Sequence, residues 1–430
     1  MNAPAPSVIA PAAEPEAAEL DAAASDPVVM GWMQGAPPPL DKQVRFDDGG
    51  MYSFPKLRWA HSNIPQLLPT TTVARGDGGV CVLPRANRDD LDPIEFTPLG
   101  RGDDRMTWAA SLAANYTDGI VVLHRGRIVY ERYFGALSAA RPHIAWSVTK
   151  SFFGLIAASL VAEGRLDPDA PVVAYVPEMA PSGLAHATVR QVMDMTTAID
   201  CSEDYTDPQA GIWQHGRAGG VLSRPADYAG PASFCDYLVT LRQVGPHGHA
   251  FAYRTVNTDL LGWILRRVTG QGLSEMLSER IWSRLGCEQD GHLMVDSAGT
   301  EFAGGGLNVC LRDLARFGEM MRHEGVFNGQ LIVPRAAIAD IRGGADTGHF
   351  AQAGYVTLPG WSYRDMWWVS HNAHGAYCAR GIHGQGVYID PTAEMVIARF
   401  ASHHIAGNMG IDPTTLPAYH ALAKHLMMAG

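Results

Sequence analysis

The clearest alternation of apolar and polar residues lies towards the two ends of the chain. Residues 119–135, GIVVLHRGRIVYERYFG, contain two β-branched and aromatic runs on either side of a His-Arg-Gly turn, which predicts a hairpin. Residues 384–402 contain GQGVYIDP and MVIARFAS, which predict two strands joined by a turn. A helix is expected at 415–428. Strands from distant parts of the chain are therefore expected to form one sheet.

Helical patterns occupy the middle of the chain. Residues 144–163 contain no proline and repeat apolar residues at helical spacing, which predicts a buried helix that ends near Gly164. Amphipathic helices closed by glycine are predicted at 257–270 and 311–325. We therefore expect an α/β (α+β) fold with a mostly antiparallel sheet flanked by helices, plus an all-helical lobe at roughly 168–325.

The N-terminal quarter of the chain has a different composition from the rest. Residues 1–27 are rich in Ala, Pro and acidic residues, and they are expected to form a disordered or loosely packed tail. Residues 28–118 are rich in Pro, Gly and short apolar pieces, so we expect an extended arm that packs on the core. Residues 119–430 would then form the main domain.

Composition and charge narrow the classes of partner. The chain has 430 residues, a formal net charge of −11 and no block of five or more basic residues, which disfavours nucleic acid and anionic membranes. The first residues lack the basic start and the apolar core of a secretory signal. The six cysteines are scattered and form no C-x-x-C pair, which favours reduced thiols. We therefore expect a cytoplasmic protein.

One lysine stands inside the apolar run at 144–161. The chain has only four lysines, Lys42, Lys56, Lys150 and Lys424, and it uses arginine for nearly all other positive charges. Ser147 precedes Lys150 by three residues, so on a helix the two side chains share one face. Burial favours the neutral amine of a lysine, which can accept a proton from a hydroxyl, whereas arginine stays protonated. The pair therefore indicates a serine nucleophile with a lysine base.

A chance match is the alternative reading of this pair. S-x-x-K is a short pattern, and a lysine at a helix edge can extend its amine to water. Other hydrolase and nucleotide signatures are absent, because the chain has no G-x-S-x-G, no G-K-[ST] and no G-x-G-x-x-G. Histidine pairs such as His247/His249 and His403/His404 lack the spacing of a known metal motif, so we interpret them as surface or loop residues.

Several separated segments together resemble one known family. These segments are SVTKSF, AEGRLDPDAPV, MDMTTAIDCSEDYTDP, YRTVNTDLLGWILRRVTG, GGGLNVCLRDLARFG and WWVSHNAHGAYCARGIHGQGVYIDP. In this order they resemble the penicillin-recognising serine hydrolases, which include class C β-lactamases, DD-peptidases and family VIII-type esterases. The likeness spans roughly residues 105–425 and is strongest to the 6-aminohexanoate-dimer hydrolases. It implies a β-lactamase/transpeptidase-like fold.

The resemblance also implies which residues act in catalysis. Ser147 matches the family's nucleophile, and Lys150 matches its lysine partner. The second family motif is usually Tyr-x-Asn, but Thr255 stands two residues before Asn257. The dimer hydrolases share a longer Tyr-x-x-x-Asn spacing, so the resemblance assigns the third catalytic group to Tyr253 and a substrate contact to Asn257.

The third family motif is Lys-Thr-Gly, and this chain departs from it. Gly381 matches the motif's glycine, so the backbone N–H groups of Ile382 and Ser147 are expected to form the oxyanion hole. Without Lys-Thr-Gly, binding of a β-lactam carboxylate is disfavoured. The resemblance further implies substrate contacts from Tyr205 and from His383.

Two more positions bear on the substrate. Trp367 and its neighbour Trp368 are expected to wall the pocket, with core packing as the alternative. Gly216 stands after His215 where some of the dimer hydrolases carry an acidic residue, which disfavours strong activity on the linear amide.

The sequence as a whole predicts a serine hydrolase that cleaves carboxylic esters or small amides. Three alternatives stay open: a 6-aminohexanoate-oligomer amidase, a β-lactamase or DD-peptidase, and a catalytically silent binding protein on the same fold. No metal or organic cofactor is implied. The expected partner is a small ester or amide rather than nucleic acid or a membrane, and a homodimer is an open alternative for the assembly.

Overall fold

The structure is a computed structural model that describes residues 20–428. Most of the expected tail at 1–27 therefore lies outside the described residues. In the described part, no helix combines the length and the apolar character that crossing a bilayer requires.

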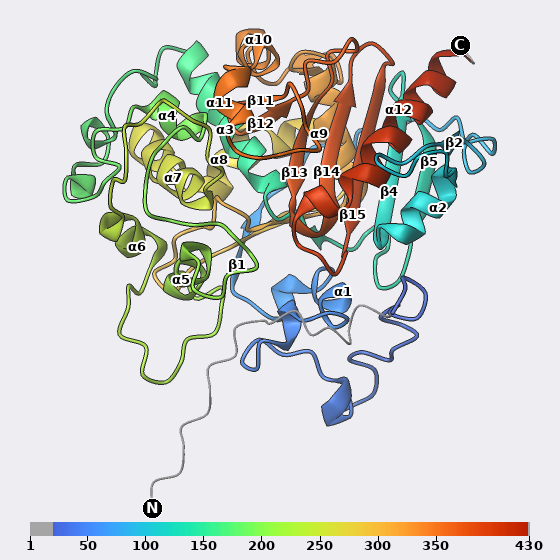
Figure 1. Cartoon of the computed structure of the whole chain (residues 1–430), viewed down its shortest axis with the longest axis horizontal. Helices are drawn as coiled ribbons and strands as arrows, with labels where there is room; N and C mark the ends of the chain where they lie inside the picture. The colour runs from blue at the N-terminus through green and yellow to red at the C-terminus, as the bar shows by residue number, and fades with distance from the viewer. Residues whose placement is uncertain (1–19, 429–430) are drawn as a thin grey trace, which may run out of the picture.

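A seven-stranded antiparallel sheet forms the centre of the fold (Figure 1). Its strand order is β11-β12-β13-β14-β15-β4-β5, so the N-terminal hairpin pairs with a strand from near the C-terminus. This confirms the sheet expected from the two ends of the chain. The strands are β4 (Thr117–His124), β5 (Arg127–Tyr133), β11 (Ser362–Arg364), β12 (Trp367–Val369), β13 (Tyr377–Gly381), β14 (Gln385–Asp390) and β15 (Met395–Ala401).

Helices cover both faces of this sheet (Figure 1). On one face, α9 (Leu311–Arg322) approaches so closely that a Cβ on Gly318 would lie 2.9 Å from the Val387 side chain. On the other face, α12 (Asp412–Met428) packs against α2 (Trp108–Ala114), and its Tyr419 ring lies 5.3 Å from the ring of Tyr388. Adjacent strand residues point to opposite faces, so these two contacts place α9 and α12 on opposite sides.

A second lobe lies beside the sheet and is mostly helical (Figure 1). Its helices are α4 (Val189–Met193), α5 (Gly211–Ala218), α6 (Phe234–Thr240), α7 (Thr255–Thr269) and α8 (Leu273–Arg280). The expected range of 168–325 also contains two strands of a separate four-stranded sheet and the sheet-packed α9. That sheet has the order β1-β7-β8-β6, formed by β1 (Thr70–Val73), β7 (Gly291–Met294), β8 (Leu307–Val309) and β6 (His143–Ile144). Strands of two to four residues are too short to produce a recognisable alternation.

The remaining elements are short. The helices are α1 (Leu57–Ala60), α10 (Arg335–Gly343) and α11 (Thr347–Ala351), and the strands are β2 (Glu95–Phe96), β3 (Met106–Thr107), β9 (Val326–Phe327) and β10 (Gln330–Leu331).

Helix α3 (Val148–Ala162) runs through the core between the sheet and the helical lobe (Figure 1). Every residue from Val148 to Leu160 is buried, as the largely apolar run at 144–161 predicted. A Cβ on Gly154 would lie 2.1 Å from the carbonyl oxygen of Asp365, so only glycine permits this close approach. The helix that carries Ser147 and Lys150 is therefore fixed in place by close packing along its length.

The N-terminal arm packs on both lobes (Figure 1). Trp32, Val44 and Met51 share an apolar cluster with Trp146, the residue before Ser147. The arm's Tyr52 hydroxyl donates a hydrogen bond to the carbonyl of Val221 in the helical lobe. The arm thus closes the side of the fold on which α3 begins.

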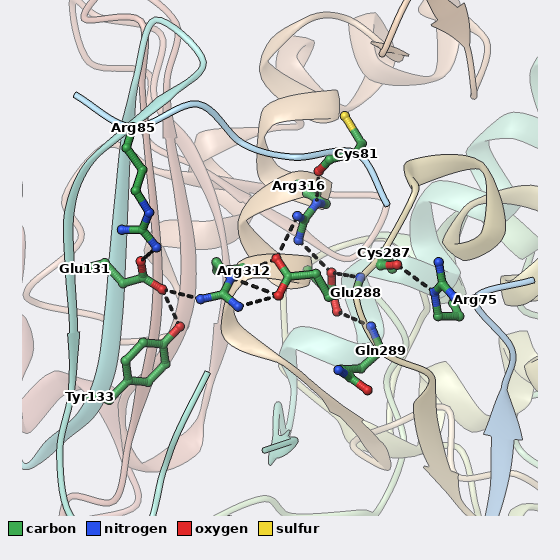
Figure 2. Close-up of polar contacts among 11 residues, drawn as sticks. Arg75, Cys81, Arg85, Glu131, Tyr133, Cys287, Glu288, Gln289, Arg312 and Arg316 are labelled. Atoms are coloured by element: carbon green, nitrogen blue, oxygen red, sulfur yellow. Dashed lines mark hydrogen bonds and ion pairs between the residues drawn. The ribbon is translucent and has the colours of Figure 1, made fainter. Parts of the chain in front are cut away.

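A network of arginines and carboxylates fastens the part of the arm around Cys81 (Figure 2). Glu288 accepts hydrogen bonds from Arg312 (2.8 Å) and Arg316 (2.8 Å), both on α9. Arg316 also donates to the carbonyl of Cys81 (2.9 Å), and Arg312 donates to Glu131 on β5 (2.9 Å). The network therefore links four segments that are distant in the sequence.

We expect Glu288→Gln to lower the free energy of unfolding by roughly 1.5–3 kcal/mol at neutral pH, the value of hydrogen bonds to charged groups. Burial alone would raise the pKa of Glu288, but Arg312 and Arg316 together lower it from 4.5 to about 2. A lowered folded-state pKa stabilises the fold above the unfolded value, and this stability is lost as pH falls through the folded value. The difference between wild type and variant should therefore shrink below about pH 4.5.

Denaturant titrations between pH 7 and pH 3 measure this difference. Glu324→Gln is a matched control, because Glu324 pairs with Arg335 (3.0 Å) but both side chains are more than half exposed. Exposed pairs contribute little, so the control should lose less than about 1 kcal/mol. Equal losses in the two variants would contradict a stabilising role for the network.

Candidate active site

Ser147 stands where the chain turns sharply into α3. The backbone N–H of Ala145 donates to the carbonyl of Leu307 (2.7 Å), which anchors the approach to the turn. Trp146 then adopts a φ of 45°, in the left-handed region that side chains larger than glycine seldom occupy. Ser147 is the N-cap residue of α3 and is 9% exposed. Its hydroxyl is thus held at the positive end of a buried helix.

Lys150 lies one helical turn further on and faces Ser147. Its Nζ is 2.8 Å from the Ser147 Oγ and also donates to the backbone carbonyl of Gly304. The side chain is buried, with 1% exposure. Burial lowers the pKa of Lys150 to about 8, although the negative charges of Glu203 and Asp259 act in the opposite direction. Near neutral pH a usable fraction of this amine is therefore unprotonated.

Tyr253 completes a cluster with these two residues. The Lys150 Nζ lies 5.1 Å from the centre of the Tyr253 ring. Burial and the charge of Glu203 raise the pKa of Tyr253 well above its ordinary value, while a hydrogen bond with Ser147 acts to lower it. Trp368 stacks on the ring, with centroids 5.5 Å apart, and holds it in place. A hydroxyl, an amine and a phenol from two distant parts of the chain thus converge on one point.

Strand β13 ends beside the start of α3. A Cβ on Gly381 would lie 2.6 Å from the carbonyl oxygen of Ala145 and 3.0 Å from the backbone nitrogen of Ser147. Ile382 follows directly, so its backbone N–H lies close to that of Ser147. Within residues 20–428, neither N–H donates to a loop carbonyl or to a side chain. Two free backbone donors next to the serine hydroxyl can hold a developing oxyanion.

Tyr205 lies next to this cluster and is oriented by an acidic side chain. Its hydroxyl donates to the Glu203 carboxylate (2.8 Å), which also accepts from the Thr255 hydroxyl (2.6 Å) at the start of α7. The nearby charges of Glu203 and Tyr253 add to burial in raising the pKa of Tyr205. Thr255 therefore holds the Glu203 side chain in place. Tyr253, two residues before Thr255, is the residue that joins Ser147 and Lys150.

Asn257 and His383, which the sequence predicts to contact the substrate, have different surroundings in the structure. Asn257 is fully buried, accepts a hydrogen bond from Thr197 (2.9 Å), and leaves its Nδ2 without a partner among the described residues. His383 follows Ile382, but its ring bonds to the carbonyl of His403 (2.7 Å) and packs near His61. Burial lowers its pKa to about 4. Through its bond to His403, His383 thus stabilises the turn that carries Ile382.

Trp367 does not wall the pocket, so this prediction is wrong. Its side chain is fully buried, its ring packs on Phe317 of α9, and its Nε1 donates to the backbone of Ser151 (3.1 Å). Successive strand residues face opposite sides, so Trp368 takes the place beside Tyr253. The two-residue period of a strand allows only one of Trp367 and Trp368 to face the site. A Trp-Trp sequence does not indicate which of the two does so.

Sequence reasoning missed two carboxylates near Lys150. Glu203 stands two residues before Tyr205 in the segment EDYTDP, and Asp259 stands two residues after Asn257. Both charges act on Lys150. An acidic residue close to an expected catalytic residue was the available signal. Among residues 20–428, no three His, Cys, Asp or Glu side chains are grouped so that they could hold a metal ion.

Comparisons with known proteins find a matching family and similar proteins. Residues 109–409 match the family described as Beta-lactamase. The chain is 35% identical over 353 residues to a 6-aminohexanoate-dimer hydrolase of Paenarthrobacter ureafaciens, covering 81% of this chain and 86% of that protein. A solved structure named "Putative 6-aminohexanoate-dimer hydrolase from Bacillus anthracis" is 31% identical, with a TM-score of 0.82, covering 91% of this chain and 99% of that one.

A more distant structure shares the fold alone. A family VIII carboxylesterase superposes with a TM-score of 0.51 at 16% identity, covering 73% of this chain and 95% of that one.

Proposed function

Because this chain belongs to the β-lactamase family, we propose that it is a serine hydrolase that cleaves carboxylic esters, and small amides more slowly, through an acyl-enzyme on Ser147. The observation that carries the proposal is the 2.8 Å contact between the Lys150 Nζ and the Ser147 Oγ. A buried lysine whose pKa is about 8 can accept the serine proton.

The first half of the reaction forms the acyl-enzyme. With the neutral amine, the Ser147 hydroxyl donates its hydrogen bond to Lys150, so the proton moves to Nζ as Oγ attacks the carbonyl carbon. The backbone N–H groups of Ser147 and Ile382 hold the oxyanion of the tetrahedral intermediate. When the intermediate collapses, Tyr253 protonates the departing alcohol or amine and takes a proton from Lys150.

The second half returns the serine. A water molecule gives a proton to Lys150 or Tyr253 while its oxygen attacks the acyl carbon. Collapse of this second intermediate breaks the bond to Oγ, releases the carboxylic acid and returns a proton to Ser147. Tyr205 and the free Nδ2 of Asn257 supply polar contacts for the substrate.

The preference for esters rests on Gly216, the position at which some of the dimer hydrolases carry an acidic residue. Gly216 offers no side chain to a departing amine, and a Cβ at this position would lie 2.8 Å from the side chain of Leu222. We expect p-nitrophenyl esters of short acids to be hydrolysed faster than the 6-aminohexanoate linear dimer. A panel of both substrate types measures this, and brisk amide cleavage without ester turnover would reverse the order.

Amide hydrolysis is the second candidate, favoured by the 35% identity to a 6-aminohexanoate-dimer hydrolase. A β-lactamase or DD-peptidase has less support, because Arg380 stands before Gly381 and its guanidinium pairs with Asp412. A fluorescent penicillin that labels Ser147 would favour that alternative. Failure of a fluorophosphonate probe to label Ser147 would instead favour a silent binding protein.

We place this activity in the cytoplasm, a location supported by six cysteines that are all unpaired. The proposed partner is a small ester or amide rather than nucleic acid or a membrane, and a homodimer is the assembly to test by sedimentation.

A further inference from the structure

A second set of polar groups leads from Lys150 through Gly304 into the helical lobe. The Lys150 Nζ donates to the carbonyl oxygen of Gly304. The N–H of the same residue donates to the Asp259 Oδ1 (2.9 Å), and the Nε2 of His215 lies 2.9 Å from the Asp259 Oδ2. Neither Asp259 nor His215 takes part in the steps proposed above.

These groups lie in the interior of the helical lobe and are almost entirely buried. His215 is fully buried, and the aromatic rings of Phe234, Tyr237 and Phe302 surround it at centroid distances of 4.8–5.9 Å. Asp259 is 7% exposed. A carboxylate is costly to bury, so its retention here calls for a physical role.

The backbone at residue 304 transmits the effect of this carboxylate. A Cβ on Gly304 would lie 2.4 Å from the Thr255 side chain and 3.1 Å from the Asp259 Oδ2, so the bare backbone fits closely between Lys150 and Asp259. The N–H of residue 304 points at the carboxylate and its carbonyl oxygen accepts from the amine. The carbonyl oxygen of Gly304 faces the amine, and the carboxylate of Asp259 holds Gly304 in place. Both groups favour a positive charge on Lys150.

Charged and titratable groups approach Lys150 from several elements. Glu203 comes from the loop before α5, Tyr253 from the segment before α7, and Asp259 from α7 itself. The two carboxylates favour the ammonium form, while burial favours the neutral amine. The balance between them decides the pH at which Lys150 loses its proton.

We propose that Asp259, beside His215, is a positioning residue that fixes Lys150 through the backbone of Gly304 and stabilises its ammonium form. This inference rests on the proposed function for its catalytic meaning. Asp259 keeps the amine aimed at Ser147 and supports the positive charge that appears on Lys150 when the serine gives up its proton. Because Asp259 favours the ammonium form, it also raises the pH at which the neutral amine of Lys150 becomes available as a base.

The titration of Lys150 tests this inference directly. With lysine labelled by ¹³C at Cε, the chain shows four lysine signals, and Lys150→Arg identifies the one of interest. In Asp259→Asn the amide oxygen can still accept from Gly304 while the charge is lost. We expect the Lys150 midpoint to move down by about one pH unit, the lower end of the effect of a nearby opposite charge. The acidic limb of the kcat/KM profile should move in the same direction.

Asp296→Asn is the matched control. Asp296 is 5% exposed and accepts backbone N–H groups, including that of Phe234 (3.0 Å), but its charge does not act on Lys150. The Lys150 midpoint should not move in this variant. The control therefore separates the general effect of losing a buried carboxylate from the proposed effect of Asp259 on the titration of Lys150.

An unchanged Lys150 midpoint in folded Asp259→Asn would overturn the inference. If that variant does not fold, Asp259→Ser supplies the same test of the charge, because it also removes the carboxylate. The nuclear magnetic resonance readout requires no turnover. The inference can therefore fail while Ser147 still reacts with a fluorophosphonate, and it can hold even if the proposed substrates are not cleaved.

Discussion

Lys150→Arg is expected to reduce kcat/KM for ester hydrolysis by roughly 10²–10⁴-fold, the contribution of a well-placed general base. Arginine keeps the positive charge and much of the length of the side chain, but it does not lose its proton at any pH at which the protein is folded. The variant therefore separates two roles of Lys150. A cation that only attracts the substrate would survive the change, whereas a base would not.

The wild-type pH profile provides a second readout of the same role. The neutral amine is the active form, so activity should rise with pH through the Lys150 pKa of about 8. Lys424→Arg is the matched control, because Lys424 is exposed near the end of α12 and should tolerate the change. Circular dichroism confirms that both variants fold. A Lys150→Arg enzyme with more than a tenth of wild-type kcat/KM would exclude lysine as the base.

The parts of the site predicted from the sequence are those that lie in one continuous element. Ser147 and Lys150 stand on the same helix, and a three-residue spacing brings them together wherever that helix lies. The sheet was predictable for a similar reason, since β4, β5, β14 and β15 are long enough to show alternation. The family match supplied Tyr253, which no local pattern distinguishes from any other tyrosine.

The parts that escaped prediction depend on contacts between distant segments. Trp367 and Trp368 are chemically identical neighbours, and only the register of β12 against β13 decides which faces Tyr253. Glu203 and Asp259 act on Lys150 from other elements, so their proximity exists only in the folded chain.

Gly381 combines a sequence match with a steric requirement that only the structure reveals. Its φ of −128° is open to any residue, so the requirement is one of space rather than of backbone conformation. A Cβ here would meet the carbonyl oxygen of Ala145 at 2.6 Å and the nitrogen of Ser147 at 3.0 Å. Both are backbone atoms, which cannot turn aside as a flexible side chain could. Even one methyl group must therefore push β13 away from the start of α3.

We therefore expect Gly381→Ala to lower kcat by about 10²–10³-fold, the cost of losing one oxyanion donor. Moving β13 outward carries the N–H of Ile382 away from that of Ser147, so one oxyanion no longer reaches both donors. Substrate binding uses other contacts, so KM should change much less than kcat. Steady-state kinetics with a p-nitrophenyl ester, together with the melting temperature, measure the two effects separately.

Gly386→Ala on the neighbouring strand β14 is the matched control for this change. Its added Cβ would lie 3.6 Å from the nearest neighbour, the carbonyl oxygen of Ala379, which is an ordinary contact. The control should keep wild-type kcat and stability, because nothing has to move. A folded Gly381→Ala enzyme with kcat within threefold of wild type would show that the oxyanion is held elsewhere. The close approach of β13 to α3 would then serve packing rather than catalysis.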